Sequence, residues 1–278
     1  MGAKRYLAPV LLGFALGAAL PLAALFSLSG FSWNLIETPT WVGFANFETL
    51  PDLTNSLMVT LWISFLAVVT QLVAGLTLGY FVSNWSRTSK SLAAVFLLPW
   101  LAAPIAIGVL WQWILAPSGG LLSNLFGIRI ELLANPLAAP ITIALISAWI
   151  GTGYTAMMVA SGLRSIPRNT VDAARIDGAN NIEILRKIQL PQIHKLIFFI
   201  VATLTLQAIG TFDLVVALTG GGPSQSTDMI SLHLVNTALK TFEIGSASAM
   251  SILLMLFSGV LLLGEYLLYR VVVRKYRD

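Results

Sequence analysis

The sequence predicts an all-α membrane protein with six transmembrane helices. Of its 278 residues, 57% are hydrophobic and only 10% are charged, whereas a typical soluble domain has about 25% charged residues. The apolar residues fall into long runs, and about 20 such residues are enough for a helix to cross a bilayer. The basic residues lie between these runs in alternate loops, which is the pattern that orients a membrane protein.

Six spans are expected from these runs, and together they form a single transmembrane domain over residues 1–278. They cover residues 6–28, 57–82, 92–115, 138–161, 194–218 and 246–269. Pro99 and Pro104 interrupt the third span. Prolines at that depth are tolerated where neighbouring helices or a cavity satisfy the carbonyl groups that they free.

The basic residues also predict the orientation of the chain. Every Lys and Arg except Arg129 and Lys240 lies before the first span, after the last, or in the loops after the second and fourth, when Lys195 at the start of the fifth span is counted with the loop before it. Arg87 and Lys90, for example, lie between the second and third spans. Because basic loops stay in the cytoplasm, both termini are predicted to be cytoplasmic.

Residues 31–53, between the first two spans, are rich in aromatic side chains. They include Trp33, Trp41, Phe44 and Phe47 together with three acidic residues and no Lys or Arg. Aromatic rings concentrate at the membrane–water interface. The segment is therefore predicted to be a short interfacial helix on the outer side.

Residues 164–192, which we call the elbow, are the longest polar interruption in the chain. The first part predicts a helix over 171–176, with Asn169 or Thr170 as its N-cap because their side-chain oxygens accept bonds from first-turn N–H groups. Gly178 is expected to end this helix, since glycine adopts a left-handed conformation at little cost.

The second part of the elbow predicts another helix. Asn180 and Glu183 have the spacing of a capping box, and Pro191 is expected to end the helix at Leu190 because it lacks an N–H donor. A folded elbow on the cytoplasmic side suggests a docking surface. An ordinary basic loop that only sets the orientation would carry the same charges.

The elbow resembles the "EAA" loop of permease subunits in ABC importers. The similarity lies in Asp172-Ala173-Ala174, then Ile176 to Ala179, and then Ile188-Gln189-Leu190-Pro191; Asp172 replaces the usual Glu, and Leu185 stands where many sugar-type members have Phe. In that family the loop is a coupling helix that inserts into a groove on the ATPase subunit. The resemblance assigns this role to Asp172, Ala173, Ala174, Asp177, Gly178, Ala179, Leu185, Leu190 and Pro191.

A second resemblance covers residues 212–250. FDLVVALTGGGPSQST followed by FEIGSASAMS is similar to a run in carbohydrate-type members, of the maltose- and glycerol-phosphate-transporter kind; WVGFANFETL and WQWILAPSGG match other family segments. The glycines at 220–222 are not a phosphate loop, because no Lys-Ser/Thr follows them. Any ATP-driven role therefore needs a separate subunit.

The resemblance implies a type I importer permease fold in a bacterial or archaeal cell membrane. It also implies several partners: a second permease subunit, two ATPase subunits that bind ATP and Mg, and an extracytoplasmic solute-binding protein. This chain itself is expected to bind no cofactor and to translocate solute by alternating access between the two sides of the membrane.

Polar residues of the fifth span are candidates for the solute pathway. Thr203 and Gln207 lie on one helical stripe, with Thr211 and Asp213 flanking it, and Gln112, Tyr154, Gln71 and Trp111 in other spans are further candidates. Hydrogen bonds between packed helices would use the same residue types. The spans contain essentially no Lys or Arg, which favours a neutral sugar; a glycerol-phosphate-type importer is the alternative.

Other classes of protein find little support in the sequence. There is no cysteine, no pair of nucleophile and base, and no H-E-x-x-H metal motif; His194 and His233 fall on opposite sides of the predicted membrane. A catalytic or metal site is therefore not expected, and neither is nucleic-acid binding, because the basic residues border spans. An integral membrane enzyme and a secondary transporter remain alternatives, although Asp213 is thin support for coupling transport to an ion. Glu265, near the cytoplasmic end of the sixth span, is expected to extend towards water or to pair at the surface.

Overall fold

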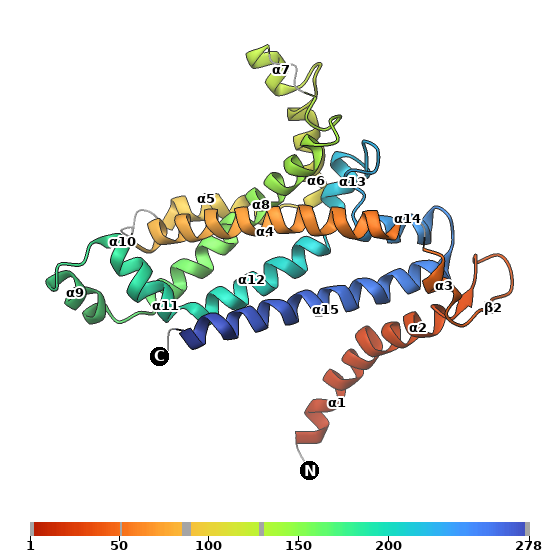
Figure 1. Ribbon diagram of the computed structural model, residues 1–278, viewed down its shortest axis with the longest axis horizontal. Coiled ribbons are helices and arrows are strands. Elements are labelled where there is room, and N and C mark those ends of the chain that lie inside the picture. Colours follow the sequence, from red (N-terminus) through yellow and green to blue (C-terminus); the bar gives the residue numbers. More distant parts are fainter. Residues whose placement is uncertain (1–2, 51, 85–89, 128–130, 276–278) are drawn as a thin grey trace. The chain divides into compact units, whose positions relative to one another are not determined.

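The computed structural model describes residues 3–50, 52–84, 90–127 and 131–275, and it consists almost entirely of helices (Figure 1). The predicted all-α class is confirmed, apart from one pair of two-residue strands. Arg87 and Arg129, which entered the prediction of orientation, lie outside the described residues.

Four described helices are long and apolar enough to cross a membrane, and two bent helix pairs raise the number to six if each pair is one span. The four comprise Pro9–Leu28, Leu53–Asn84, Ala138–Arg164 and Ile244–Arg274. The helices fall into two compact units: Met1–Leu57 with Ile230–Val260, and Met58–Met229 with Leu261–Asp278. We describe each unit by itself.

The first unit begins with one long apolar helix and a small hairpin. The helix consists of α1 (Ala3–Phe14), a π-helical turn η1 (Ala15–Ala19) and α2 (Leu20–Leu28). Strands β1 (Phe31–Ser32) and β2 (Thr40–Trp41) pair antiparallel. The unit also contains α3 (Ala45–Glu48), α14 (Ile230–Leu239), the start of α4 (Leu53–Asn84) and the first half of α15 (Ile244–Lys275).

The hairpin corrects the predicted interfacial helix over 31–53, which is reduced to the four residues of α3. The amide of Asn46 accounts for this arrangement, because its Nδ2 donates to the carbonyl oxygens of Ser29 (2.8 Å) and Phe31 (2.9 Å). These bonds hold the start of β1 and the chain just before it against α3. Trp41 and Phe44 remain exposed, as aromatic residues at a membrane interface would be.

The second unit is organised around α8 (Ala138–Arg164), which is the most deeply buried of the long helices. Around it lie the rest of α4, α5 (Lys90–Leu101), α6 (Pro104–Ile114), α12 (His194–Ile209), α13 (Asp213–Leu218) and the end of α15; α7 (Leu121–Phe126) lies in the loop after α6. Small residues let the helices approach closely. Gly153 of α8, for example, lies so near the carbonyl of Phe96 in α5 that a Cβ atom would collide with it.

Two of the expected spans are not single straight helices. The third, 92–115, consists of α5 and α6, which are bent by 108° at residues 102–103. The fifth, 194–218, was predicted as one helix, but α12 ends at Ile209 and α13 starts only at Asp213. Gly210 and Thr211 at this break are poor helix formers, and the apolar composition of the span concealed the interruption.

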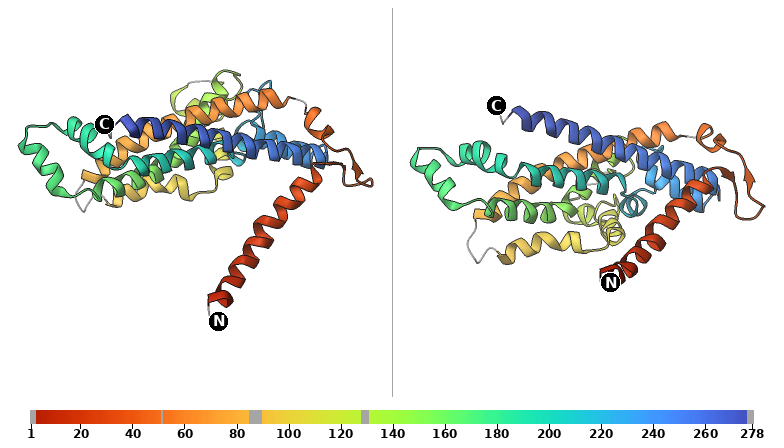
Figure 2. Two further views of the ribbon diagram at one scale, coloured as in Figure 1. Left: turned by 60° about the horizontal axis from the view of Figure 1, so that its bottom comes forward. Right: turned by 90° about the horizontal axis from the view of Figure 1, so that it is seen from below.

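The elbow contains α9 (Arg168–Ile176), α10 (Asn181–Ile184), a π-helical turn η3 (Leu185–Gln189) and α11 (Leu190–Gln192). It connects α8 to α12 at one end of the second unit (Figures 1 and 2). The predicted capping box of Asn180 and Glu183 is confirmed. The predicted N-cap of the first helix at Asn169 or Thr170 is wrong, because α9 already starts at Arg168, with Pro167 as its N-cap.

The predicted end of the second elbow helix at Leu190 is also wrong, because the helix continues through Pro191 to Gln192. Proline lacks an N–H donor, and its ring clashes with the carbonyl of the preceding turn. The π-helical turn Leu185–Gln189 just before it holds one extra residue and widens the helix, and the N–H of Leu190 bonds to the carbonyl of Leu185. Pro21 follows the turn η1 in the same way.

Close packing of α5 on α8 predicts that Gly153→Ala destabilises the protein. A methyl group at this position must displace the backbone of α5, and such overpacking costs about 1–3 kcal/mol. The control is Gly259→Ala in α15, where nothing lies within 4 Å of the added carbon. Thermal unfolding in detergent should show a lower Tm for the first variant only; equal Tm values would contradict the close contact.

Candidate functional site

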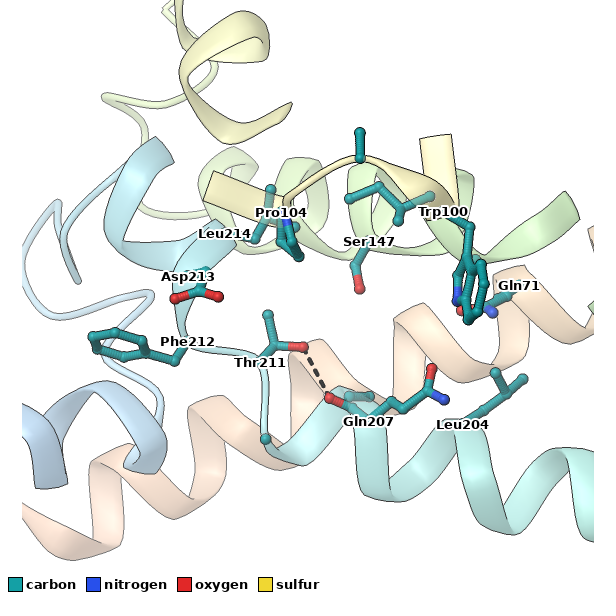
Figure 3. A pocket seen from close by; sticks show the side chains of 15 residues that line it. Gln71, Trp100, Pro104, Ser147, Leu204, Gln207, Thr211, Phe212, Asp213 and Leu214 are labelled. Atoms are coloured by element: carbon teal, nitrogen blue, oxygen red, sulfur yellow. Dashed lines mark hydrogen bonds between the residues drawn. The ribbon is translucent and has the colours of Figure 1, made fainter. Parts of the chain in front are cut away.

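A cavity of about 280 Å³ lies in the second unit beside both helix breaks (Figure 3). Side chains and backbone from α4, from α8 and from both interrupted helices surround it. The lining residues are Gln71, Trp100, Ala102, Pro104, Ser147, Ile150, Gly151, Leu204, Gln207, Ala208, Gly210, Thr211, Phe212, Asp213 and Leu214.

Both breaks follow from local sequence. Ala103 has an extended conformation (φ −63°, ψ 127°), because the ring of Pro104 disfavours the helical conformation at the residue before it. Asp213 begins α13, where an acidic side chain is favoured by the unpaired N–H groups of the first turn. Backbone groups freed by a broken helix are tolerated in a membrane only beside protein or a water-filled cavity, so the position of this cavity suits an aqueous pathway.

Gln71 is held in the cavity wall by α8. Its side chain is buried, and its Nε2 donates a hydrogen bond of 3.0 Å to the hydroxyl of Thr155. The amide fits only because residue 151 is glycine, since a Cβ atom at Gly151 would collide with it. The position of this polar group is therefore fixed by the packing of α4 on α8.

Aromatic rings line two parts of the cavity. Trp100 stacks on Tyr154, with ring centroids 4.7 Å apart and an angle of 10° between the planes. In Figure 3, Trp100 and Gln71 lie at one end of the cavity and Phe212 and Asp213 lie at the other. Such a mixture of aromatic surface and a few polar groups is typical of small-molecule sites.

The charge of the lining is negative. Asp213 is the single acidic residue among the described lining residues, and none of them is Lys, Arg or His. A carboxylate without a nearby cation repels an anionic solute. The amides of Gln71 and Gln207 and the hydroxyls of Ser147 and Thr211 supply neutral donors and acceptors.

The cavity brings together only part of the predicted pathway. Gln207, Thr211 and Asp213 line it, whereas Thr203 does not: its hydroxyl bonds back to the carbonyl oxygens of Phe199 (3.0 Å) and Ile200 (2.8 Å). Gln112 is exposed outside the lining, and Tyr154 lies behind Trp100. The sequence missed Trp100, Ser147 and Phe212; Trp100 and Phe212 adjoin the two helix breaks, so Pro99, Pro104 and Gly210 were the available signal.

The elbow has an anchored side. Val171, Leu185 and Leu190 pack against the buried cluster that contains Val159 and Ile193, and Ala174 is buried as well. Of the residues expected to couple to an ATPase, Leu185 and Leu190 therefore face the core of the unit, and they hold the elbow in place.

The opposite side of the elbow is exposed. Gly178, with a left-handed φ of +85°, turns the chain between α9 and α10, and Asp172, Ala173 and Asp177 are accessible; Ala179 and Pro191 are half-buried. Ile176 and Ile182 are 86% and 67% exposed. Neither isoleucine belonged to the predicted coupling set.

Residues 71–278 match the family described as "Binding-protein-dependent transport system inner membrane component". This chain belongs to that family. It is 30% identical over 252 residues to the trehalose/maltose transport system permease protein MalF of Thermococcus litoralis, with 88% of this chain and 84% of the relative covered. It is 29% identical over 222 residues to the sn-glycerol-3-phosphate transport system permease protein UgpA of Rhizobium meliloti, with 77% and 76% covered.

Solved structures show the same fold. A chain of the bacterial alginate ABC transporter, in complex with an alginate pentasaccharide-bound periplasmic protein, aligns with a TM-score of 0.84 at 19% identity and covers 97% of this chain and 94% of that one. A chain of the MetNI methionine ABC transporter aligns with a TM-score of 0.55 at 18% identity, covering 79% and 95%. The predicted importer permease fold is thereby confirmed.

Membership in the permease family establishes the general role of the chain. It is a multi-pass membrane subunit that takes part in transport and is not an enzyme, and its family works with a binding protein and ATPase partners. The resemblance seen in the elbow and in residues 212–250 is therefore confirmed at the level of the family.

The capping box of the permease elbow predicts a measurable loss on substitution. The side chain of Asn180 accepts bonds from the N–H groups of Ile182 and Glu183, both 3.0 Å long. Asn180→Ala should destabilise α10 by about 1 kcal/mol, because the N-cap hydrogen bonds are lost, and should therefore speed amide hydrogen exchange in α10 about fivefold. Ser231→Ala, a polar truncation in α14, should leave exchange in α10 unchanged; unaltered exchange in Asn180→Ala would show that the cap does not limit opening.

The same cap predicts a pH dependence. The pKa of Glu183 is lowered below its usual range. The main cause is the hydrogen bond that its carboxylate accepts from the backbone N–H of Asn180, and the second is its pairing with the Lys187 ammonium group. Because the folded pKa is depressed, the contribution of Glu183 is complete above the unfolded pKa and is lost as the pH falls through the folded pKa. Exchange in α10, corrected for its intrinsic pH dependence, should therefore rise on acidification in the native chain, and Glu183→Gln should abolish that trend.

Proposed function

We propose that this chain is a permease subunit of an ATP-driven importer for a neutral carbohydrate. The observation that carries the proposal is the lining of the cavity. Its described residues include two glutamines, two hydroxyl residues, aromatic rings and one carboxyl group, and none of them is a cation. The amides and hydroxyls suit a solute rich in hydroxyl groups. The aromatic face of Trp100 suits the C–H face of a sugar ring, and the single negative charge disfavours an anion.

The relatives support a carbohydrate-type importer and also supply the alternative. MalF of Thermococcus litoralis is named for trehalose and maltose, and UgpA of Rhizobium meliloti is named for sn-glycerol 3-phosphate. A phosphorylated solute would favour Lys or Arg in the pathway, because hydrogen bonds from these charged side chains to phosphate are stronger than hydrogen bonds from neutral groups. The described lining contains neither residue, so the neutral solute is preferred.

The assembly that we propose follows the family pattern. Residues 1–278 act as one transmembrane domain with both termini in the cytoplasm, and a second permease subunit completes the translocation path. Two ATPase subunits, which bind ATP and Mg, dock on the elbows, and an extracytoplasmic protein delivers the solute. The contact surface on this chain consists of the exposed Ile176 and Ile182 and, in the same part of the elbow, Asp172, Ala173, Asp177 and Gly178. Closure of the ATPases moves this surface, and the movement opens the cavity alternately to the two sides of the membrane.

Docking through the exposed isoleucines predicts that Ile176→Ser with Ile182→Ser separates the ATPase from the permease. Burial of one such side chain contributes about 1.5–3 kcal/mol, so the double variant should weaken the association at least about tenfold. The measurement is co-purification of the ATPase with the tagged chain from membranes. Leu137→Ser, an equally exposed apolar residue before α8, should leave it unchanged; retention of the ATPase by the double variant would contradict the docking surface.

The nature of the solute is tested by uptake into vesicles that hold the complex purified through this chain, with ATP and the binding protein supplied. We expect uptake of a neutral sugar such as maltose or trehalose and none of glycerol 3-phosphate. Gln207→Ala should lower the uptake rate at limiting sugar about two- to tenfold, the effect of about 0.5–1.5 kcal/mol for one hydrogen bond. Gln112→Ala, outside the cavity, is the control. Uptake of glycerol 3-phosphate but not of sugar would select the alternative.

A further inference from the structure

A second, larger hollow lies on the second unit, between the elbow, α12 and the end of α15. It has a volume of about 760 Å³, within the usual range for small-molecule sites. Its floor is apolar and includes Leu190, Ile197, Val201, Leu268 and Val272. We call it the α12–α15 groove. None of the residues that line it lines the cavity at the helix breaks.

Aromatic side chains lie along the groove near the elbow. Tyr269 stacks on Phe198 with centroids 4.6 Å apart and on His194 with centroids 5.8 Å apart. The Nδ1 atom of His194 lies 2.7 Å from the carbonyl oxygen of Pro191, which fixes the ring. Tyrosines at the end of an apolar helix mark the depth of the lipid headgroups, so the elbow end of the groove opens at that level.

Positive charge surrounds this open end. Arg186 lines the groove itself, and Arg270 and Arg274 lie on the adjoining face of α15, with the guanidinium of Arg270 5.9 Å from the ring centre of Tyr266. Among the described residues, no acidic side chain forms an ion pair with any of the three. Glu183, the acid nearest to Arg186 in sequence, is already bound to Lys187 (3.1 Å).

The far end of the groove has the opposite character. Glu265 was expected to extend towards water or to pair at the surface, but its Oε1 accepts a hydrogen bond from Thr205, and its Oε2 is shielded from solvent. This end of the groove presents a carboxyl group and, among its described lining residues, no cation to an anionic headgroup. The groove is therefore polarised, with cations where it opens and a carboxyl group where it ends.

We propose that the α12–α15 groove binds an acidic phospholipid. Its phosphate lies on Arg186, and one acyl chain follows the apolar floor towards Glu265. Basic pockets between transmembrane helices on the cytoplasmic side attract acidic headgroups in this way. Because the groove joins the elbow to α12 and α15, a lipid bound there contacts the segment between the ATPase-docking surface and the spans.

The test uses the purified full-length chain in detergent, titrated with phosphatidylglycerol and followed by native mass spectrometry. We expect tighter binding of phosphatidylglycerol than of phosphatidylcholine, and no displacement by inorganic phosphate. Arg186→Gln should weaken phosphatidylglycerol about fivefold, which corresponds to about 1 kcal/mol for one basic residue near the surface, and Arg186→Lys should retain most of the binding. Arg168→Gln, which removes an exposed charge from α9 outside the groove, should have no effect.

Several results would overturn the proposal. They are unchanged binding in Arg186→Gln, equal binding of phosphatidylcholine, or displacement of the lipid by free phosphate. Glu265→Gln should not weaken the lipid; if it does, the groove takes an occupant with a hydrogen-bond donor instead. The sequence has no cysteine, so Leu268→Cys gives a single thiol, and efficient crosslinking from it to another subunit in the assembled importer would show that a protein helix fills the groove.

Discussion

A hydrocarbon environment offers no water to an unpaired backbone group, and this constraint governs the whole chain. Continuous helices satisfy it without help, so each interruption needs a local remedy. The π-helical turns η1 and η3 are one remedy, because they let the helix pass Pro21 and Pro191 without ending. The breaks at 102–103 and 210–212 have a different remedy: both border the same cavity, where water can bond to the freed backbone groups. The breaks in the third and fifth spans thus lie at one site.

The number and place of the apolar helices could be read from the sequence because hydropathy reports burial in lipid directly. Local motifs that depend on a few neighbouring atoms were also readable, as the capping box of Asn180 and Glu183 and the turn at Gly178 show. The break after Ile209 was not, since the mean hydropathy of residues 194–218 is high enough for one span and a break in the helix does not change it. The helix end predicted at Leu190 was wrong for a different reason. The rule that proline ends a helix describes an α-helix, and the π-helical turn before Pro191 accommodates the proline.

Only part of the candidate site could be predicted from the sequence. Asp213 and Gln207 were found because polar residues in an apolar run are conspicuous, but Thr203 has the same appearance and only bonds to its own helix. Trp100 and Phe212 were missed because aromatic residues in a membrane protein are common everywhere. Their importance depends on the two breaks, which bring α5 and α13 to one cavity, and that is a property of tertiary packing. For the same reason, sequence could not tell that Leu185 faces the core while Ile182 faces away from it.

The path from the elbow to the cavity runs through α12. Its first turn follows α11 of the elbow, and Leu204, Gln207 and Ala208 near its other end line the cavity. Sixteen residues make a helix about 24 Å long. Its residues Ile200 and Leu204 lie in the buried cluster against which Leu185 and Leu190 of the elbow pack. A force applied to the elbow is therefore carried by one packed body. The helix ends at its C-cap, Gly210, so under the proposed function the break beside Asp213 is where a movement of the elbow becomes a change in the shape of the cavity.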